Sequence, residues 1–134
     1  MYFLMTKDLG NGPHLLGVLR RTDVGYEFEY AADIPKEFEI PGLLISHNKH
    51  YDDNVKNYIL HRVVPESTHM FIKEFLQQEN MQEYDEWELL NRLWERFRKN
   101  NKQTKYPLHD RKQRVYFYKA LPGRYHRFEQ TRKN

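Results

Sequence analysis

The clearest helix signal in the sequence is Tyr84-Asp85-Glu86-Trp87-Glu88-Leu89-Leu90-Asn91-Arg92-Leu93-Trp94-Glu95-Arg96-Phe97. Its large apolar residues recur at steps of three and four positions, which places on one helix face Trp87, Leu90, Trp94 and Phe97, with Leu89 and Leu93 widening the stripe. Asp85 and Glu88 resemble the start of a capping box, and their charges suit the positive end of a helix. The sequence therefore predicts a helix whose apolar face the rest of the chain must cover.

This helix is the second half of a stretch, residues 57–97, that has the pattern of two amphipathic helices joined by a short break. Upstream, the apolar residues between Val55 and Val64 favour a helix that ends before Pro65. Another helix is predicted after this proline, and its apolar residues are expected to point inward: Met70, Phe71, Phe75 and Leu76. The break before the clearest helix is predicted at residues 77–83.

The N-terminal third predicts a small antiparallel meander. Residues 2–6 are typical of a first strand, and a segment of turn formers connects them to residues 14–21. In Tyr26-Glu27-Phe28-Glu29-Tyr30, aromatic and acidic residues alternate with period two, so we expect the three rings on the core side of a strand. Further along, we predict a short strand at residues 43–45 and an exposed polar loop at residues 46–54.

The chain changes character after Phe97. Residues 98–105 are polar and basic, which is typical of a loop, whereas residues 114–120 have the pattern of a strand. A turn and a possible return strand at residues 124–128 would complete a hairpin. We therefore predict an α+β fold, in which a small antiparallel meander packs on a two- to three-helix cluster and a basic β-hairpin lies at the C-terminus.

A chain of 134 residues is long enough for one domain with one core. We expect residues 1–97 to form an α+β domain and residues 98–134 to form a basic extension within the same compact unit. The chain contains no cysteine, which fits a cytoplasmic protein and excludes disulfide and thiolate chemistry. No apolar run reaches the roughly 18 residues that a membrane span requires, so we expect no membrane partner.

The charges are distributed unevenly along the chain. Residues 92–134 carry 14 Lys and Arg against 3 Asp and Glu, whereas residues 1–91 carry 8 basic against 16 acidic residues. This asymmetry has two interpretations. It indicates either a basic surface that binds an anionic partner or an intramolecular match between the two halves.

Candidate catalytic and metal-binding residues are few. The sequence lacks a cysteine nucleophile, a G-x-S-x-G or H-E-x-x-H motif and a phosphate-binding glycine loop. The run His47-Asn48-Lys49-His50-Tyr51-Asp52-Asp53 offers imidazole and carboxylate ligands, but its spacing matches no defined metal site and Lys49 interrupts it. We interpret it as a polar loop and expect no enzymatic activity, no metal and no cofactor.

The predicted C-terminal hairpin carries a possible nucleic-acid-binding surface. One face of its first strand combines cations with flat rings, which suits phosphates and unstacked bases of a single strand of DNA or RNA. The alternative is an ordinary edge hairpin, with Val115 and Phe117 in the core and basic residues keeping it soluble. The candidate nucleic-acid-binding residues are Lys102, Lys105, Arg111, Lys112, Arg114, Tyr116, Tyr118, Arg124 and Arg127.

Several short runs within the first 97 residues carry a family resemblance: Leu16-Gly17-Val18-Leu19, Tyr26-Glu27-Phe28-Glu29-Tyr30, Ile40-Pro41-Gly42-Leu43-Leu44-Ile45, Leu60-His61-Arg62-Val63-Val64-Pro65-Glu66 and Tyr84-Asp85-Glu86-Trp87-Glu88-Leu89-Leu90. Together they resemble the N-terminal domain of HipA-type serine/threonine kinase toxins, which also occurs as a separate small protein, HipS. The last two runs are similar to the family's F-x-x-L-L-P-E helix end and D-x-F-x-L-L helix. The chain departs from the family after this helix, because residues 91–101 contain no glycine-rich segment and no kinase core follows.

The resemblance implies a non-catalytic docking module of a toxin–antitoxin system. Such a module would bind and restrain a protein partner, such as a HipA-like kinase or its DNA-binding antitoxin. The residues that we predict to bind this partner are Tyr51, Tyr58 and Arg62, while Trp87 and Trp94 stay candidates only if they are not buried. The alternative function is a nucleic-acid-binding accessory protein, or an inhibitor carried by a phage or mobile element, that uses the basic C-terminal region.

Overall fold

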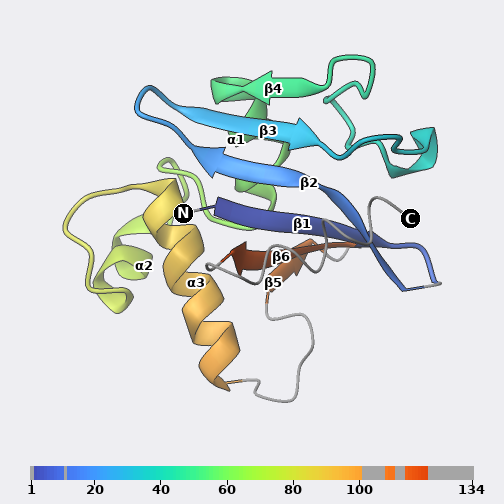
Figure 1. Ribbon diagram of the computed structural model, residues 1–134. Helices are drawn as coiled ribbons and strands as arrows, with labels where there is room; N and C mark the ends of the chain where they lie inside the picture. The colour runs from blue at the N-terminus through green and yellow to red at the C-terminus, as the bar shows by residue number, and fades with distance from the viewer. Residues whose placement is uncertain (1, 11, 101–107, 111–113, 121–134) are drawn as a thin grey trace.

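The computed structural model describes residues 2–10, 12–100, 108–110 and 114–120, and these residues adopt the predicted α+β fold (Figure 1). Within them, six strands form one sheet and three α-helices pack beside it. No helix of the described residues combines the length and the apolar character that a membrane crossing requires. In chain order the elements are β1 (Tyr2–Asp8), β2 (Pro13–Arg21), β3 (Tyr26–Tyr30), the 3-10 helix η1 (Lys36–Phe38), β4 (Lys49–Tyr51), α1 (Asp52–Tyr58), the 3-10 helix η2 (Leu60–Arg62), α2 (Ile72–Gln78), α3 (Glu86–Asn100), β5 (Leu108–Asp110) and β6 (Val115–Ala120).

The sheet has the strand order β4-β3-β2-β1-β6-β5, and all of its pairs are antiparallel. The predicted N-terminal meander is confirmed as β1, β2 and β3. The strand predicted at residues 114–120 is confirmed as β6, but it lies inside the sheet between β1 and β5, where Leu4 pairs with Val18 on one side and with Tyr118 on the other. The predicted turn and return strand, residues 121–128, lie outside the described residues.

The main core lies between one face of this sheet and the helices. Phe3 is fully buried, and its ring meets the edge of the Trp87 ring of α3 at a centroid distance of 5.3 Å. Burial of each such side chain contributes about 1.5–3 kcal/mol. The side chains that alternate with the core residues point to the opposite face, where a smaller cluster forms around Leu4, Leu15, Val18 and Ala31.

The apolar face predicted for the clearest helix is confirmed in α3. Trp87 and Trp94 are each only 7% exposed, and Leu89 and Leu90 are fully buried. The side chain of Phe97 is outside the described part of the structure. Since both tryptophans belong to the core, they are no longer candidates for partner contact.

The prediction of a strand at residues 43–45 is wrong. This segment contains only an isolated bridge between Ile40 and Leu43. The reason is the hydroxyl of Tyr30, which donates to the Leu43 carbonyl at 2.5 Å and accepts from the Ile40 amide at 2.9 Å. The edge strand is instead β4, within the region predicted to be an exposed loop, and its middle residue His50 is its only buried member.

Two helix predictions also need correction. The helix predicted from Val55 to Val64 is divided, because the backbone of Ile59 is not helical and η2 follows α1. In the next helix, Met70 and Phe71 do not point inward but are 80% and 55% exposed. The α-helix begins only at Ile72, so these two side chains lie before the turn that would have directed them towards the core.

Candidate functional site

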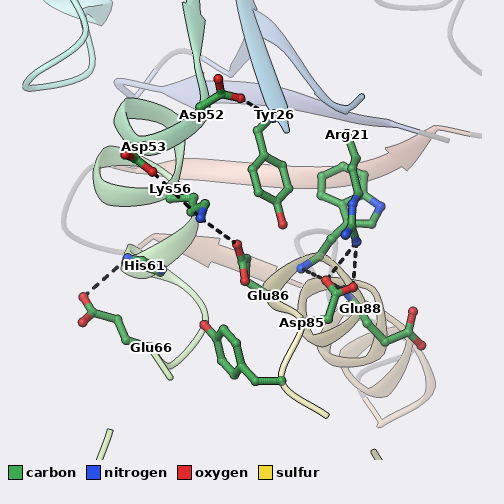
Figure 2. A network of polar contacts seen from close by, with 12 residues as sticks. Arg21, Tyr26, Asp52, Asp53, Lys56, His61, Glu66, Asp85, Glu86 and Glu88 are labelled. Atoms are coloured by element: carbon green, nitrogen blue, oxygen red, sulfur yellow. Dashed lines mark hydrogen bonds and ion pairs between the residues drawn. The ribbon is translucent and has the colours of Figure 1, made fainter. Parts of the chain in front are cut away.

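A polar cleft of about 560 Å³ lies where the turn between β2 and β3 meets the starts of α1 and α3 (Figure 2). Its lining includes two cations, Arg21 and Lys56, and five carboxylates. The carboxylates come from three separate parts of the chain and are Asp23, Asp52, Asp53, Asp85 and Glu86.

Asp85 connects two of the elements around this cleft. Its Oδ1 accepts the backbone N–H groups of Trp87 at 2.9 Å and Glu88 at 3.2 Å, which confirms the predicted cap of α3. Nη1 of Arg21 donates to both oxygens of the same carboxylate, at 2.9 and 2.8 Å. Glu88 does not complete a capping box in the described contacts but pairs with Arg92 at 2.9 Å.

This arrangement shifts the pKa of both partners. The hydrogen bond to Asp85 is the main cause that raises the Arg21 pKa. Burial by itself would raise the Asp85 pKa, but the hydrogen bonds from Arg21 and from the helix amides outweigh it and lower this pKa below its ordinary value. Both groups are therefore held in their charged forms.

A second set of contacts connects β3, α3 and α1. The Tyr26 phenol is buried, and this burial, together with the neighbouring Glu86 carboxylate, raises the Tyr26 pKa. Glu86 also lies 3.7 Å from the Lys56 ammonium, which in turn lies 3.9 Å from Asp53. The network (Figure 2) therefore begins at the buried, neutral Tyr26, and the exposure of its charged side chains increases from Glu86 through Lys56 to Asp53.

Asp52 fixes the entry into α1. Its Oδ1 accepts the backbone N–H of Tyr26 at 3.1 Å, and its own backbone has a φ of 49°, a left-handed conformation that Asp tolerates better than most residues. Position 25 must be glycine for this contact, because a Cβ on Gly25 would lie 1.9 Å from that Oδ1. The turn sequence and the helix start therefore depend on one another.

The cleft carboxylates mainly hold the fold together. Asp52, Asp85 and Glu86 already accept hydrogen bonds or ion pairs from Tyr26, Arg21 and Lys56. The Asp53 carboxylate also lies 3.9 Å from Lys56, but its side chain is 90% exposed and presents its charge to solvent. Within the described ranges, no group of three or more histidine and acidic residues is placed to hold a metal ion.

The possible metal ligands in residues 47–53 point in different directions. The His50 ring is buried, donates from Nε2 to the Leu44 carbonyl at 2.8 Å and meets the edge of Tyr30. Asp52 instead points into the polar cleft, where it binds the Tyr26 amide. The His47 ring lies against the His50 ring at a centroid distance of 6.4 Å, but Asp52 points away from this pair, so the histidines and the carboxylates of residues 47–53 do not converge on one site.

The residues predicted to bind a protein partner divide between two faces. The buried His50 ring points towards the helices, so its neighbour Tyr51 points to the opposite face of the sheet and is 53% exposed. Tyr58 and Arg62 end α1 and η2, which pack on the helical face. The structure therefore brings Tyr58 and Arg62 together and places Tyr51 apart from them.

Tyr58 and Arg62 border a shallow recess whose floor is apolar. The floor includes Ile40 and Phe117, so the recess reaches the buried side of β6. Tyr58 is 41% exposed, and its ring lies against Gly42, where a Cβ would lie 2.4 Å from the ring. We call Tyr58, Arg62 and this recess the Tyr58 surface.

The predicted nucleic-acid-binding residues are only partly described. Along β6, Val115 and Phe117 are buried in the main core, whereas Tyr116 and Tyr118 are half-buried and Tyr118 packs on the smaller cluster. Arg114 is exposed and immediately precedes the strand. The other predicted contacts lie outside the described residues: Lys102, Lys105, Arg111, Lys112, Arg124 and Arg127.

Sequence reasoning missed the polar cleft. The turn at residues 22–25 and the start of the clearest helix each carried a local signal, but nothing in either one indicated that they meet. The comparisons with models of known protein families, with curated proteins and with solved structures gave no match. The resemblance to the HipA-type N-terminal domain therefore rests on the sequence motifs alone.

Proposed function

We propose that this protein is a non-catalytic, cytoplasmic docking module that binds and restrains a protein partner, as the resemblance to HipS and the HipA N-terminal domain implies. The observation that supports it most is the Tyr58 surface. Tyr and Arg are, with Trp, the residue types enriched among interface hot spots, which cluster where packing is dense and water is excluded. Here one residue of each type borders an apolar recess.

The Tyr58 surface is also rigid enough to bind without a large entropic cost. The backbone of Gly42 supports the Tyr58 ring from below, and Ile59 and Leu60 anchor the adjoining backbone in the main core. A side chain that is already fixed in its bound conformation loses little freedom on association. The recess has a volume of only about 10 Å³, which is too small for a side chain, so the partner that we propose is a HipA-like kinase that packs an apolar surface across it.

The test is a binding titration with a purified HipA-like kinase, using the wild type and single alanine variants. We expect Tyr58→Ala and Arg62→Ala each to weaken binding about tenfold or more, because truncation of a hot spot costs about 2 kcal/mol. Tyr51→Ala is the matched control, since Tyr51 is an exposed tyrosine on the opposite face. Equal affinities for wild type and Tyr58→Ala, or no binding of the kinase by the wild type, would contradict the proposal.

The alternative, nucleic-acid binding, is favoured by the alternation along β6. Tyr116 and Tyr118 share the face opposite the main core, and Arg114 stands exposed at the start of the strand. Titration with labelled single- and double-stranded oligonucleotides at low and moderate salt tests this role. Binding that weakens steeply with salt, and that Arg114→Ala, Arg124→Ala and Arg127→Ala reduce but Tyr58→Ala does not, would favour it over docking.

A further inference from the structure

The segment that carries α2 is attached to the rest of the molecule mainly at its two ends. From Glu66 to Gln78 no residue is buried, although Met70 and Phe71 are large apolar side chains. Figure 1 shows α2 at the periphery, beside α3 and away from the strands. Its apolar residues Ile72, Phe75 and Leu76 are half-buried, and Leu76 packs on the main core.

The backbone N–H groups of this segment form local hydrogen bonds. The backbone N–H groups of Ile72, Phe75 and Glu79 donate to the carbonyls of His69, Phe71 and Phe75 respectively. Separation of the segment from α3 therefore breaks none of these bonds. A unit with few buried apolar contacts and with its own hydrogen bonds can open at a low free-energy cost while the remaining fold stays intact.

Both ends of the segment are held firmly. At the first end, the Tyr84 hydroxyl donates to the Pro65 carbonyl at 2.8 Å. At the other end, Glu79 is only 8% exposed, its carboxylate forms an ion pair with Arg96 of α3, and its backbone carbonyl accepts a hydrogen bond from Arg92. A buried carboxylate depends strongly on its partner, because loss of either charge leaves the other uncompensated.

From these contacts we infer that residues 66–80 form a flap that opens as a unit, with the Glu79–Arg96 ion pair as its latch. Opening withdraws Leu76 from the main core and separates Glu79 from Arg92 and Arg96 of α3. This device is independent of the Tyr58 surface, so it goes beyond docking and adds a conformational control to the fold.

Hydrogen exchange measured by mass spectrometry on the full chain tests the latch. In the wild type, we expect amides of the flap to exchange at least tenfold faster than those of β1 and β2. In Glu79→Gln, exchange of the flap should accelerate by about a further tenfold, while the rates in β1 and β2 stay unchanged. Glu88→Gln is the matched control, because Glu88 also pairs with an arginine of α3 but lies within that helix.

Three outcomes would overturn the inference. The first is flap exchange as slow as that of the sheet in the wild type. The second is equal acceleration of flap and sheet by Glu79→Gln, which would show global unfolding. The third is equal effects of Glu79→Gln and Glu88→Gln. Arg96→Gln removes the same ion pair from its exposed side, so it provides the same test if Glu79→Gln fails to fold.

Discussion

Arg21 at the end of β2 binds Asp85 at the start of α3 across a separation of 64 residues, with Nη1 lying 2.9 Å from Oδ1 and 2.8 Å from Oδ2. The same carboxylate caps the helix, so one side chain both starts α3 and fixes it to the sheet. The helix with the clearest signal in the sequence therefore starts at an ion pair whose two residues lie further apart in sequence than those of the other described ion pairs of the cleft.

We expect Asp85→Ala to destabilise the protein by about 1–2 kcal/mol, because it removes the helix cap and the ion pair together. Urea unfolding at pH 7 measures the effect. Asp53→Ala is the control: Asp53 is also acidic and lines the cleft, but its side chain is 90% exposed. A similar loss in both variants would show that the connection through Asp85 contributes nothing specific.

The lowered pKa of Asp85 predicts an acid-dependent loss of stability. The folded state favours the charged carboxylate, so its contribution is fully present above the unfolded pKa of about 3.9 and is lost as the pH falls through the folded pKa. The free energy of unfolding should therefore fall less steeply below about pH 4 in Asp85→Asn than in the wild type. Arg21→Gln should flatten the profile similarly, and parallel profiles for all three proteins would contradict this account.

At alkaline pH the raised pKa of Tyr84 predicts a loss of stability as the pH increases. Burial is the main cause that raises the pKa of Tyr84 to about 12, and the nearby Glu86 charge adds to it. The folded state thus favours the neutral phenol, and its contribution is present below the unfolded pKa of about 10 and is lost as the pH rises through the folded value. Between about pH 10 and 12, Tyr84→Phe should lose less stability than the wild type. Equal losses in this range would show that Tyr84 is not the group responsible.

The sequence correctly predicted those helices and strands whose pattern of apolar residues lies within one continuous run. The alternation Tyr26, Phe28, Tyr30 identified β3, and the steps from Trp87 to Trp94 identified the buried face of α3. In contrast, β4 has exposed residues on both sides of its one buried position, His50, so it offered no apolar alternation. A three-residue edge strand can form without such a pattern because its neighbour β3 supplies the hydrogen bonds.

The candidate site was less predictable for a related reason. The capping role of Asp85 is local and could be predicted, but its partner Arg21 could not, since no pattern connects positions 64 residues apart. Tyr51, Tyr58 and Arg62 were predicted together as contacts of one protein partner. The alternation at the end of β4 then placed Tyr51 on the other face, which only the three-dimensional arrangement reveals.

The contact between Gly42 and Tyr58 gives the sharpest test of the Tyr58 surface. Gly42 has a φ of +93°, and an added Cβ would lie 2.4 Å from the Tyr58 ring, so Gly42→Ala should strain the backbone and displace the ring. Gly10→Ala is the matched control, because Gly10 also has a positive φ of +114° but no atom within 4 Å of its added Cβ. We expect Gly10→Ala to cost about 1–2 kcal/mol from the backbone alone and Gly42→Ala to cost more.

A double-mutant cycle isolates the ring contact from the backbone strain. In the Tyr58→Ala background the ring is absent, so Gly42→Ala should cost only about as much as Gly10→Ala does in the wild type. The difference between the two backgrounds, measured by urea unfolding, is the energy of the displaced ring. The same cycle in kinase binding should show that Gly42→Ala weakens the complex only while Tyr58 is present. A coupling energy of zero in unfolding would mean that the glycine is required for its backbone conformation and does not support the ring.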